Sequence, residues 1–226
     1  MKITLSFIFL NLFIFIGTHP LLTTTADVIY DSVGNKLLKG VPYYIMPLLR
    51  GTGGGLTLTR ATKDACPLDV TQEPFELSYG VPFTITPIIF DENYVREAYP
   101  VSIEANVADP CQGSKILKLS TSDNIVAATA TATTTKTITI GGQLNAPESC
   151  FQLVEDDMMP GLRSYQIQLC PFKCGSNTSP STDMTCYNIG LVSNPDGNRF
   201  LAPTDAIYPV VFQNSFGSSV ASVQSE

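Results

Sequence analysis

The chain has 226 residues, of which 44% are hydrophobic and 15% are charged, so it can build one or two domains with a buried core. Its 13 basic and 20 acidic residues give a net charge of −7, which argues against nucleic acid or an anionic membrane surface as a partner. It contains a single histidine, His19, and no tryptophan.

The first 26 residues have the organisation of a secretory signal peptide. Lys2 supplies a basic start, residues 3–16 form a mostly apolar run, and small residues follow at 23–26. The run is shorter than the roughly 20 apolar residues of a membrane span, so it is typical of a signal peptide. We expect cleavage between residues 17 and 26. This would leave a secreted domain, residues 27–226, that has lost His19.

Beyond the signal, apolar and polar residues alternate with the period of two that half-buried β-strands show. This pattern predicts strands at residues 43–46, 56–59, 83–86, 101–104, 137–140, 151–154, 165–169 and 210–212. Turn residues separate them, and the Ala/Thr alternation at 127–135 is interpreted as strand or loop filler. No amphipathic helix longer than two turns is found. The chain is therefore predicted to form a single all-β, barrel-like domain.

Cysteine usage agrees with secretion. The six cysteines are Cys66, Cys111, Cys150, Cys170, Cys174 and Cys186, and all of them follow the expected signal peptide. An even number in an oxidising compartment indicates three disulfides, and a zinc site is disfavoured because no Cys-x-x-Cys pair is present. Asn177 begins an N-glycosylation sequon in a stretch rich in Gly, Ser, Thr and Pro, which predicts an exposed, glycosylated loop.

Catalytic function has little support in this sequence. Without His19, the mature chain has no imidazole for serine–histidine or cysteine–histidine catalysis or for a histidine metal site. Asp156 and Asp157 are adjacent carboxylates, but they fall at the tip of a predicted hairpin, where a solvated turn is expected. Residues 51–55 lack the Lys-Ser/Thr that completes a phosphate-binding loop. We predict that the chain is not an enzyme and uses no cofactor or metal.

Motifs along the whole mature chain resemble those of the plant Kunitz family, the soybean trypsin inhibitor type. The first is Ile29-x-Asp31-x-x-Gly34-Asn35-x-Leu37 followed by Tyr43-x-Ile45, and the later ones, in order, are Cys66-Pro67-Leu68, Gly80-Val81-Pro82-Phe83, Phe151-Gln152-Leu153, Tyr165-Gln166-Ile167-Gln168-Leu169-Cys170-Pro171, Cys186-x-x-Ile189-Gly190, Arg199-Phe200-Leu201-Ala202 and Pro209-Val210-Val211-Phe212. Val33 departs from the family pattern, which usually has an acidic or amide residue there. The resemblance implies a monomeric β-trefoil, with twelve strands in three pseudo-repeats that form a six-stranded barrel capped by hairpins.

The resemblance also implies two disulfides, Cys66–Cys111 and Cys170–Cys186, and leaves Cys150 and Cys174 as additional cysteines. If residues 150–155 and 164–169 form a hairpin, Cys150 lies beside Cys170 and its neighbours. A Cys150–Cys174 bridge is then geometrically reasonable, while the pairing of Cys150 with Cys170 and of Cys174 with Cys186 stays open.

Members of this family usually inhibit a protease with one exposed, substrate-like loop, whose rigidity limits the entropy lost on binding. The matching loop lies between Gly80 and Pro100, and the resemblance assigns the inhibitory contact to Ile88, Ile89, Phe90 and Asp91. The expected partner is an endopeptidase, and the expected location is the extracellular space or apoplast, with a vacuole left open. A role in plant defence follows from the same resemblance.

The composition of the loop indicates which protease it suits. No Lys or Arg occurs at residues 87–94, so the loop has no cation for the buried carboxylate of a trypsin-like pocket. Ile89 or Phe90 would suit an apolar, chymotrypsin-like or elastase-like pocket of a serine protease. Arg96, the nearest basic residue, is expected to begin the following strand. Asp91 and Glu92 at the tip favour a basic active-site cleft.

One position argues for a different function. Inhibitors of the family usually place an Asn just before the Gly that precedes the first Tyr, where its side chain braces the loop. Lys39 stands there, and its side chain has no hydrogen-bond acceptor. The alternative hypothesis is therefore a non-inhibitory protein of the same fold, with a storage, defence or ligand-binding role.

Overall fold

The computed structural model describes residues 26–60, 65–89, 92–108, 111–126, 131–159, 161–175, 184–194 and 197–216. Nearly all of the expected signal peptide, residues 1–25, lies outside the described residues. Among the described residues, no helix is long and apolar enough to cross a membrane.

Twelve strands and two short 3₁₀ helices make up the regular structure of the described residues. They are β1 (Pro42–Pro47), β2 (Leu56–Thr59), β3 (Asp69–Gln72), β4 (Pro82–Pro87), β5 (Val101–Ala105), β6 (Leu117–Val126), β7 (Thr131–Ile140), η1 (Pro147–Ser149), β8 (Phe151–Glu155), β9 (Tyr165–Leu169), η2 (Pro171–Lys173), β10 (Tyr187–Ser193), β11 (Arg199–Pro203) and β12 (Val210–Asn214). All eight strands predicted from the sequence are present, and β2 and β9 have the predicted bounds.

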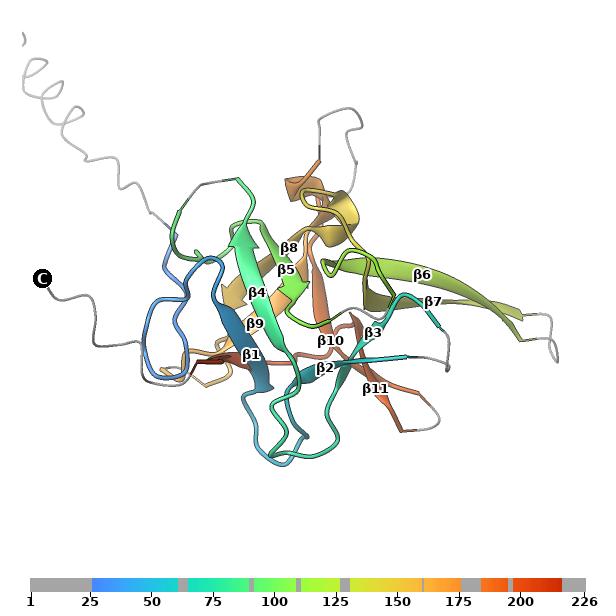
Figure 1. Ribbon diagram of the computed structural model, residues 1–226, viewed down its shortest axis with the longest axis horizontal. Coiled ribbons are helices and arrows are strands. Elements are labelled where there is room, and N and C mark those ends of the chain that lie inside the picture. The colour runs from blue at the N-terminus through green and yellow to red at the C-terminus, as the bar shows by residue number, and fades with distance from the viewer. Residues whose placement is uncertain are drawn as a thin grey trace, which may run out of the picture.

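Six of the strands close into a barrel. Antiparallel pairing runs from β1 to β4, β5, β8, β9 and β12, and β12 pairs back with β1, so this sheet has no free edge. The other six strands form the hairpins β2–β3, β6–β7 and β10–β11, and β3 pairs with both β7 and β11. Each run of four strands thus gives two barrel strands and one hairpin (Figure 1). This confirms the β-trefoil expected from the resemblance.

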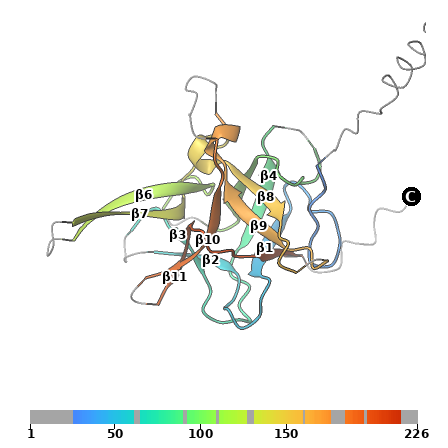
Figure 2. The same ribbon diagram turned by 180° about the vertical axis from the view of Figure 1, so that it is seen from behind.

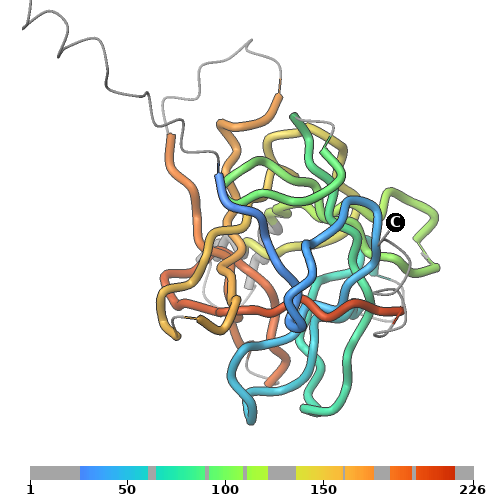
Figure 3. Tube along the Cα trace, turned by 90° about the vertical axis from the view of Figure 1, so that its left-hand side faces the viewer, coloured from blue at the N-terminus to red at the C-terminus, as the bar shows by residue number. Residues whose placement is uncertain are grey.

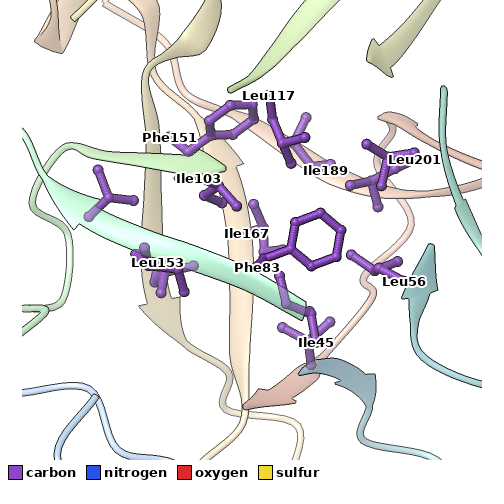
Figure 4. Packing of buried hydrophobic residues seen from close by; sticks show 14 of the residues in the cluster. Ile45, Leu56, Phe83, Ile103, Leu117, Phe151, Leu153, Ile167, Ile189 and Leu201 are labelled. Atoms are coloured by element: carbon purple, nitrogen blue, oxygen red, sulfur yellow. The ribbon is translucent and has the colours of Figure 1, made fainter. Parts of the chain in front are cut away.

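The three repeats contribute matching residues to one apolar core (Figure 4). The first barrel strand of each repeat supplies an isoleucine, and the first strand of each hairpin supplies a leucine or isoleucine: Ile45, Ile103 and Ile167, then Leu56, Leu117 and Ile189. Each of these side chains is at most 2% exposed. Burial of such a side chain contributes about 1.5–3 kcal/mol, so the alternating pattern that predicts the strands also supplies the core.

Four strands were not predicted from the sequence. In β3, the polar side chains of Thr71 and Gln72 are buried together with Val70. β6 and β7 are ten residues each and project from the barrel as a long ribbon (Figures 1 and 2), and their core residues Leu117, Ile138 and Ile140 lie at its inner end. The predicted strand at 137–140 is the inner end of β7. β10 and β11 were likewise missed.

Three disulfides join Cys66 to Cys111, Cys150 to Cys174 and Cys170 to Cys186. These are the two pairs implied by the resemblance and the additional pair favoured by the hairpin argument. All six cysteines are oxidised, so none is left for zinc.

The expectation of a solvated turn at Asp156 and Asp157 is wrong for one of the two residues. Asp157 is exposed, but Asp156 is 8% exposed, and its amide donates to the carbonyl of Ser164 across the β8–β9 hairpin. The hydrogen bond continues the ladder one residue beyond the pair Glu155–Tyr165 and so turns Asp156 inward.

Candidate functional site

The connection between β4 and β5 forms an exposed loop at the upper left of Figure 1. The amide of Ile88 donates to the carbonyl of Pro100 at 3.0 Å and closes the base of the loop. Ile89 is 56% exposed. Phe90 and Asp91, the other two residues assigned to the inhibitory contact, lie outside the described residues. The structure therefore describes the two sides of the loop and not its tip.

The second side of the loop is held by residues 26–39, which we call the N-terminal strap. The amide of Lys39 donates to the carbonyl of Asn93 at 2.9 Å, and the amide of Val95 donates to Leu37 at 2.9 Å. On the other edge, the amide of Ile29 donates to Val95 at 3.0 Å. Val95 is fully buried. Main-chain hydrogen bonds on two edges thus fix the loop directly after its tip (Figure 3).

A turn built around Asp31 folds the strap back towards the loop. The buried carboxylate of Asp31 accepts hydrogen bonds from the amides of Val33 at 3.1 Å and Asn35 at 2.8 Å. Gly34 has a φ of +95°, a conformation that favours glycine. The motif Asp31-x-x-Gly34-Asn35 is therefore the turn that aligns the two halves of the strap. Val33 contributes its amide and leaves its side chain 68% exposed, which explains why the departure from the family pattern is tolerated.

The sequence analysis expects Arg96 to begin the next strand, and this prediction is wrong. β5 begins at Val101, and Arg96 pairs with Val28 of the strap. Its guanidinium lies 2.5 Å from Glu92, donates to the carbonyl of Ala26 at 2.9 Å and donates to the hydroxyl of Tyr94 at 3.1 Å. The hydrogen bond to Glu92 raises the pKa of Arg96. This guanidinium is engaged within the loop, so it is not presented to a protease pocket.

Tyr94 packs between charged side chains of the strap and the loop. The ammonium of Lys36 and the guanidinium of Arg96 lie 4.9 Å and 5.0 Å from the centre of its ring. Cations at such distances are attracted to the face of an aromatic ring. Tyr94 also pairs with Leu38 of the strap through the backbone. The contacts with Lys36 and Leu38 are not local in sequence, so no local pattern predicts them.

The end of the loop is anchored on residues of the second and third repeats of the trefoil. The amide of Ala98 donates to Leu153 at 2.8 Å, and the ammonium of Lys173 donates to the carbonyl of Ala98 at 2.8 Å. Lys173 also lies 2.5 Å from the side-chain oxygen of Gln152. Desolvation lowers the pKa of Lys173. The sequence analysis missed Lys173, which gives no signal beyond its place next to Cys174.

Other candidate sites are limited among the described residues. No group of three or more histidine, cysteine or carboxylate side chains there is placed to hold a metal ion. A hollow of about 340 Å³ has Met46, Leu77 and Tyr79 in its lining and is bordered by the β1–β2 and β3–β4 connections. These two connections lie at the bottom of Figure 1. The sequon residue Asn177 lies outside the described residues.

Comparisons with known proteins agree with the fold. A Kunitz family model described as "Trypsin and protease inhibitor" matches residues 29–214. Kunitz trypsin inhibitor 5 of Arabidopsis thaliana is 31% identical over 94% of this chain and 99% of that protein, and miraculin of Synsepalum dulcificum is 28% identical over 94% and 96%. The structure of a Kunitz-type trypsin inhibitor from Cicer arietinum covers 84% of this chain and 99% of its own, with a TM-score of 0.65 and 25% identity.

Proposed function

The chain belongs to the Kunitz family of trypsin and protease inhibitors, and from this premise we propose that it blocks a serine endopeptidase with the loop between β4 and β5. Members of the family are inhibitors that bind proteases as partners, and they are not enzymes. The family assignment thus confirms the prediction that the chain is not an enzyme. The proposed contact residues are Ile88, Ile89, Phe90 and Asp91.

The observation that carries the proposal is the way the loop is held on both sides of its tip. Ile88 is tied to Pro100, and Asn93 and Val95 are tied to the N-terminal strap. A loop that is already fixed loses little conformational entropy when it binds, which is the general condition for tight inhibition by a substrate-like segment. The brace through Lys39 uses the backbone amide, so it does not depend on an Asn side chain at this position.

The preferred target is a protease with an apolar specificity pocket and not trypsin. Ile89 is exposed in the first half of the loop, and residues 87–94 contain no Lys or Arg. Arg96 is engaged by Glu92, Ala26 and Tyr94. A buried carboxylate in the pocket of trypsin would find no cation in this loop.

Replacement of residues 88–91 by Gly and Ser tests the assignment of the loop. The variant is expected to lose at least about 100-fold in inhibition of chymotrypsin, elastase or subtilisin, because the anchor residues of an interface dominate its affinity. A matched control replaces Met158 and Met159, which are exposed between β8 and β9, and is expected to inhibit normally. Unchanged inhibition after the loop replacement would show that another surface binds the protease.

The proposal includes secretion and glycosylation. The apolar run at residues 3–16 and the cysteine pairing support export through an oxidising compartment. Mass spectrometry of the protein from its own tissue is expected to find a chain that begins between residues 18 and 27, with a glycan on Asn177. An intact Met1 in the accumulated protein would contradict this part of the proposal.

A non-inhibitory role is the second candidate, and one observation favours it. The hollow of about 340 Å³ near Met46 and Tyr79 has a volume in the range of small-ligand sites. The two candidates differ in a direct assay, because a non-inhibitory protein would leave every serine protease of a panel fully active at micromolar concentration.

A further inference from the structure

Arg96 connects the segment directly after the loop tip to the start of the N-terminal strap, which is far away in the sequence. Its guanidinium contacts Glu92 directly after the loop tip, Tyr94 in the braced half of the loop, and the carbonyl of Ala26 at the start of the N-terminal strap. Ala26 and Arg96 are 70 positions apart. The side chain of Arg96 is 18% exposed and that of Glu92 is 30% exposed, so the contacts are largely covered.

The chemistry of arginine suits this arrangement. The guanidinium is a planar fork with five donors, and it can hold a carboxylate and a carbonyl at the same time. Lysine can supply the charge but lacks the fixed fork. The acceptor supplied by the strap is a main-chain carbonyl, so its presence depends only on whether residue 26 belongs to the chain.

We infer that Arg96 is a positioning residue that clamps the loop to Ala26, and that the point at which the chain is processed therefore sets how firmly the loop is held. This inference rests on the proposed inhibitory function. The range of cleavage sites expected from the sequence allows the mature chain to begin at Ala26 or at Asp27. A chain that begins at Ala26 or earlier keeps the acceptor, and a chain that begins at Asp27 loses it.

Processing at Asp27 would also add a charge at an unfavourable place. The nitrogen of residue 27 is covalently next to the carbonyl of Ala26, which lies 2.9 Å from the guanidinium. The new α-ammonium would thus stand within about 5 Å of Arg96, where like charges repel. Trimming by one residue therefore removes the carbonyl acceptor of the clamp.

The test is a double-mutant cycle that combines trimming with replacement of Arg96. Proteins that begin at Ala26 or at Asp27 are prepared with Arg96, with Arg96→Lys and with Arg96→Ala. Two quantities are measured: the inhibition constant against chymotrypsin, and the hydrogen-exchange rates of the Lys39 and Val95 amides, which bond the loop to the strap. The exchange rates report on the clamp whether or not the protein inhibits.

With Arg96 present, trimming is expected to weaken inhibition about three- to tenfold and to speed exchange at both amides by a similar factor, as for a partly exposed charge-assisted contact. With Arg96→Ala, trimming is expected to change neither quantity, because the clamp is already absent. Arg96→Lys is expected to restore part of the inhibition in the longer chain only. Arg199→Lys, at the opposite end of the barrel, is the matched control and is expected to leave both quantities unchanged.

The possible outcomes distinguish the proposed clamp from the proposed inhibitory function. Equal inhibition and equal exchange in the long and trimmed chains would overturn the clamp. An equal effect of trimming with and without Arg96 would also overturn it, because the strap would then act without the arginine. A chain that inhibits no protease but shows the expected exchange pattern would retain the clamp and reject the inhibitory function.

Discussion

Two buried tyrosines in the barrel differ in how their hydroxyl groups are satisfied. The hydroxyl of Tyr165 accepts a hydrogen bond from the amide of Tyr30 at 2.9 Å, which ties the barrel to the N-terminal strap. The hydroxyl of Tyr208 is buried and has no hydrogen-bond partner among the described residues. A buried polar group without a hydrogen-bond partner destabilises the folded state, whereas a buried polar group that is hydrogen-bonded stabilises it.

Replacement of each tyrosine by phenylalanine should therefore have opposite effects on stability. Tyr165→Phe is expected to lower the free energy of unfolding by about 1–3 kcal/mol, because the amide of Tyr30 is left unpaired. Tyr208→Phe is expected to leave the free energy of unfolding unchanged or to raise it by about 1 kcal/mol. Urea denaturation at neutral pH measures both. A loss of stability in Tyr208→Phe equal to that in Tyr165→Phe would contradict this account.

The residues at the candidate site could be predicted only in part. The absence of Lys and Arg at 87–94 is read directly from the sequence, the exposure of the loop is implied by the family resemblance, and Ile89 is exposed as expected. The long-range contacts of Arg96, Tyr94 and Lys173 could not be predicted, because those partners lie far away in the chain. Lys173 and Ala98, for example, are 75 positions apart. Only the closed barrel brings such residues together.

At the scale of elements, the two 3₁₀ helices are held to each other by a disulfide outside the family's usual pairs. Cys150 follows η1 and Cys174 follows η2, so their bond fastens the start of β8 to the segment after β9. The closed loop spans 24 residues of sequence separation, and a disulfide stabilises mainly by restricting the unfolded chain.

Replacement of both Cys150 and Cys174 by Ser is expected to lower the free energy of unfolding by about 3 kcal/mol, on the chain-entropy model for a loop of this length. Thermal and urea denaturation of the oxidised proteins measure the loss. The double variant Cys66→Ser/Cys111→Ser, which opens a loop with a separation of 45, is the control and is expected to lose slightly more. No change in the first variant would mean that this disulfide does not restrict the unfolded chain.

The strands show which elements the alternating sequence pattern predicts and which it does not. Alternation predicts β1, β4, β5, β8, β9 and β12, which form the barrel, since one face of each strand lines the core. It also predicts β2 and the inner end of β7. It misses β3, in which the polar residues Thr71 and Gln72 are buried, and it also misses the hairpin strands β6, β10 and β11, of which β10 and β11 are only partly buried. The threefold arrangement came from the family resemblance and not from the pattern.

At the scale of the whole molecule, buried tyrosines make the free energy of unfolding depend on pH in the alkaline range. Burial raises the pKa of Tyr43, Tyr165 and Tyr208 above its usual value. The unfolded chain therefore loses these protons at lower pH than the folded protein, and it binds fewer protons above about pH 10. The free energy of unfolding should then fall as pH rises above about 10, with these tyrosines contributing nothing to the pH dependence below about pH 9.

Urea denaturation between about pH 8 and 11 checks this dependence. Tyr208→Phe is expected to lose stability less steeply with rising pH than the parent protein, because one of the three groups is removed. Lys173, whose lowered pKa acts in the opposite direction below about pH 10.4, is present in both proteins and cancels in the comparison. Identical pH dependence in the two proteins would show that Tyr208 does not titrate differently in the folded state.

The central claim is that a braced loop with no Lys or Arg at residues 87–94 blocks a protease that has an apolar specificity pocket. The most direct measurement is the inhibition constant of the oxidised, signal-free protein against chymotrypsin, elastase, subtilisin and trypsin. The account predicts tight inhibition of at least one of the first three and at least about 100-fold weaker inhibition of trypsin. Trypsin inhibition of equal strength, or no inhibition of any of the four, would contradict it.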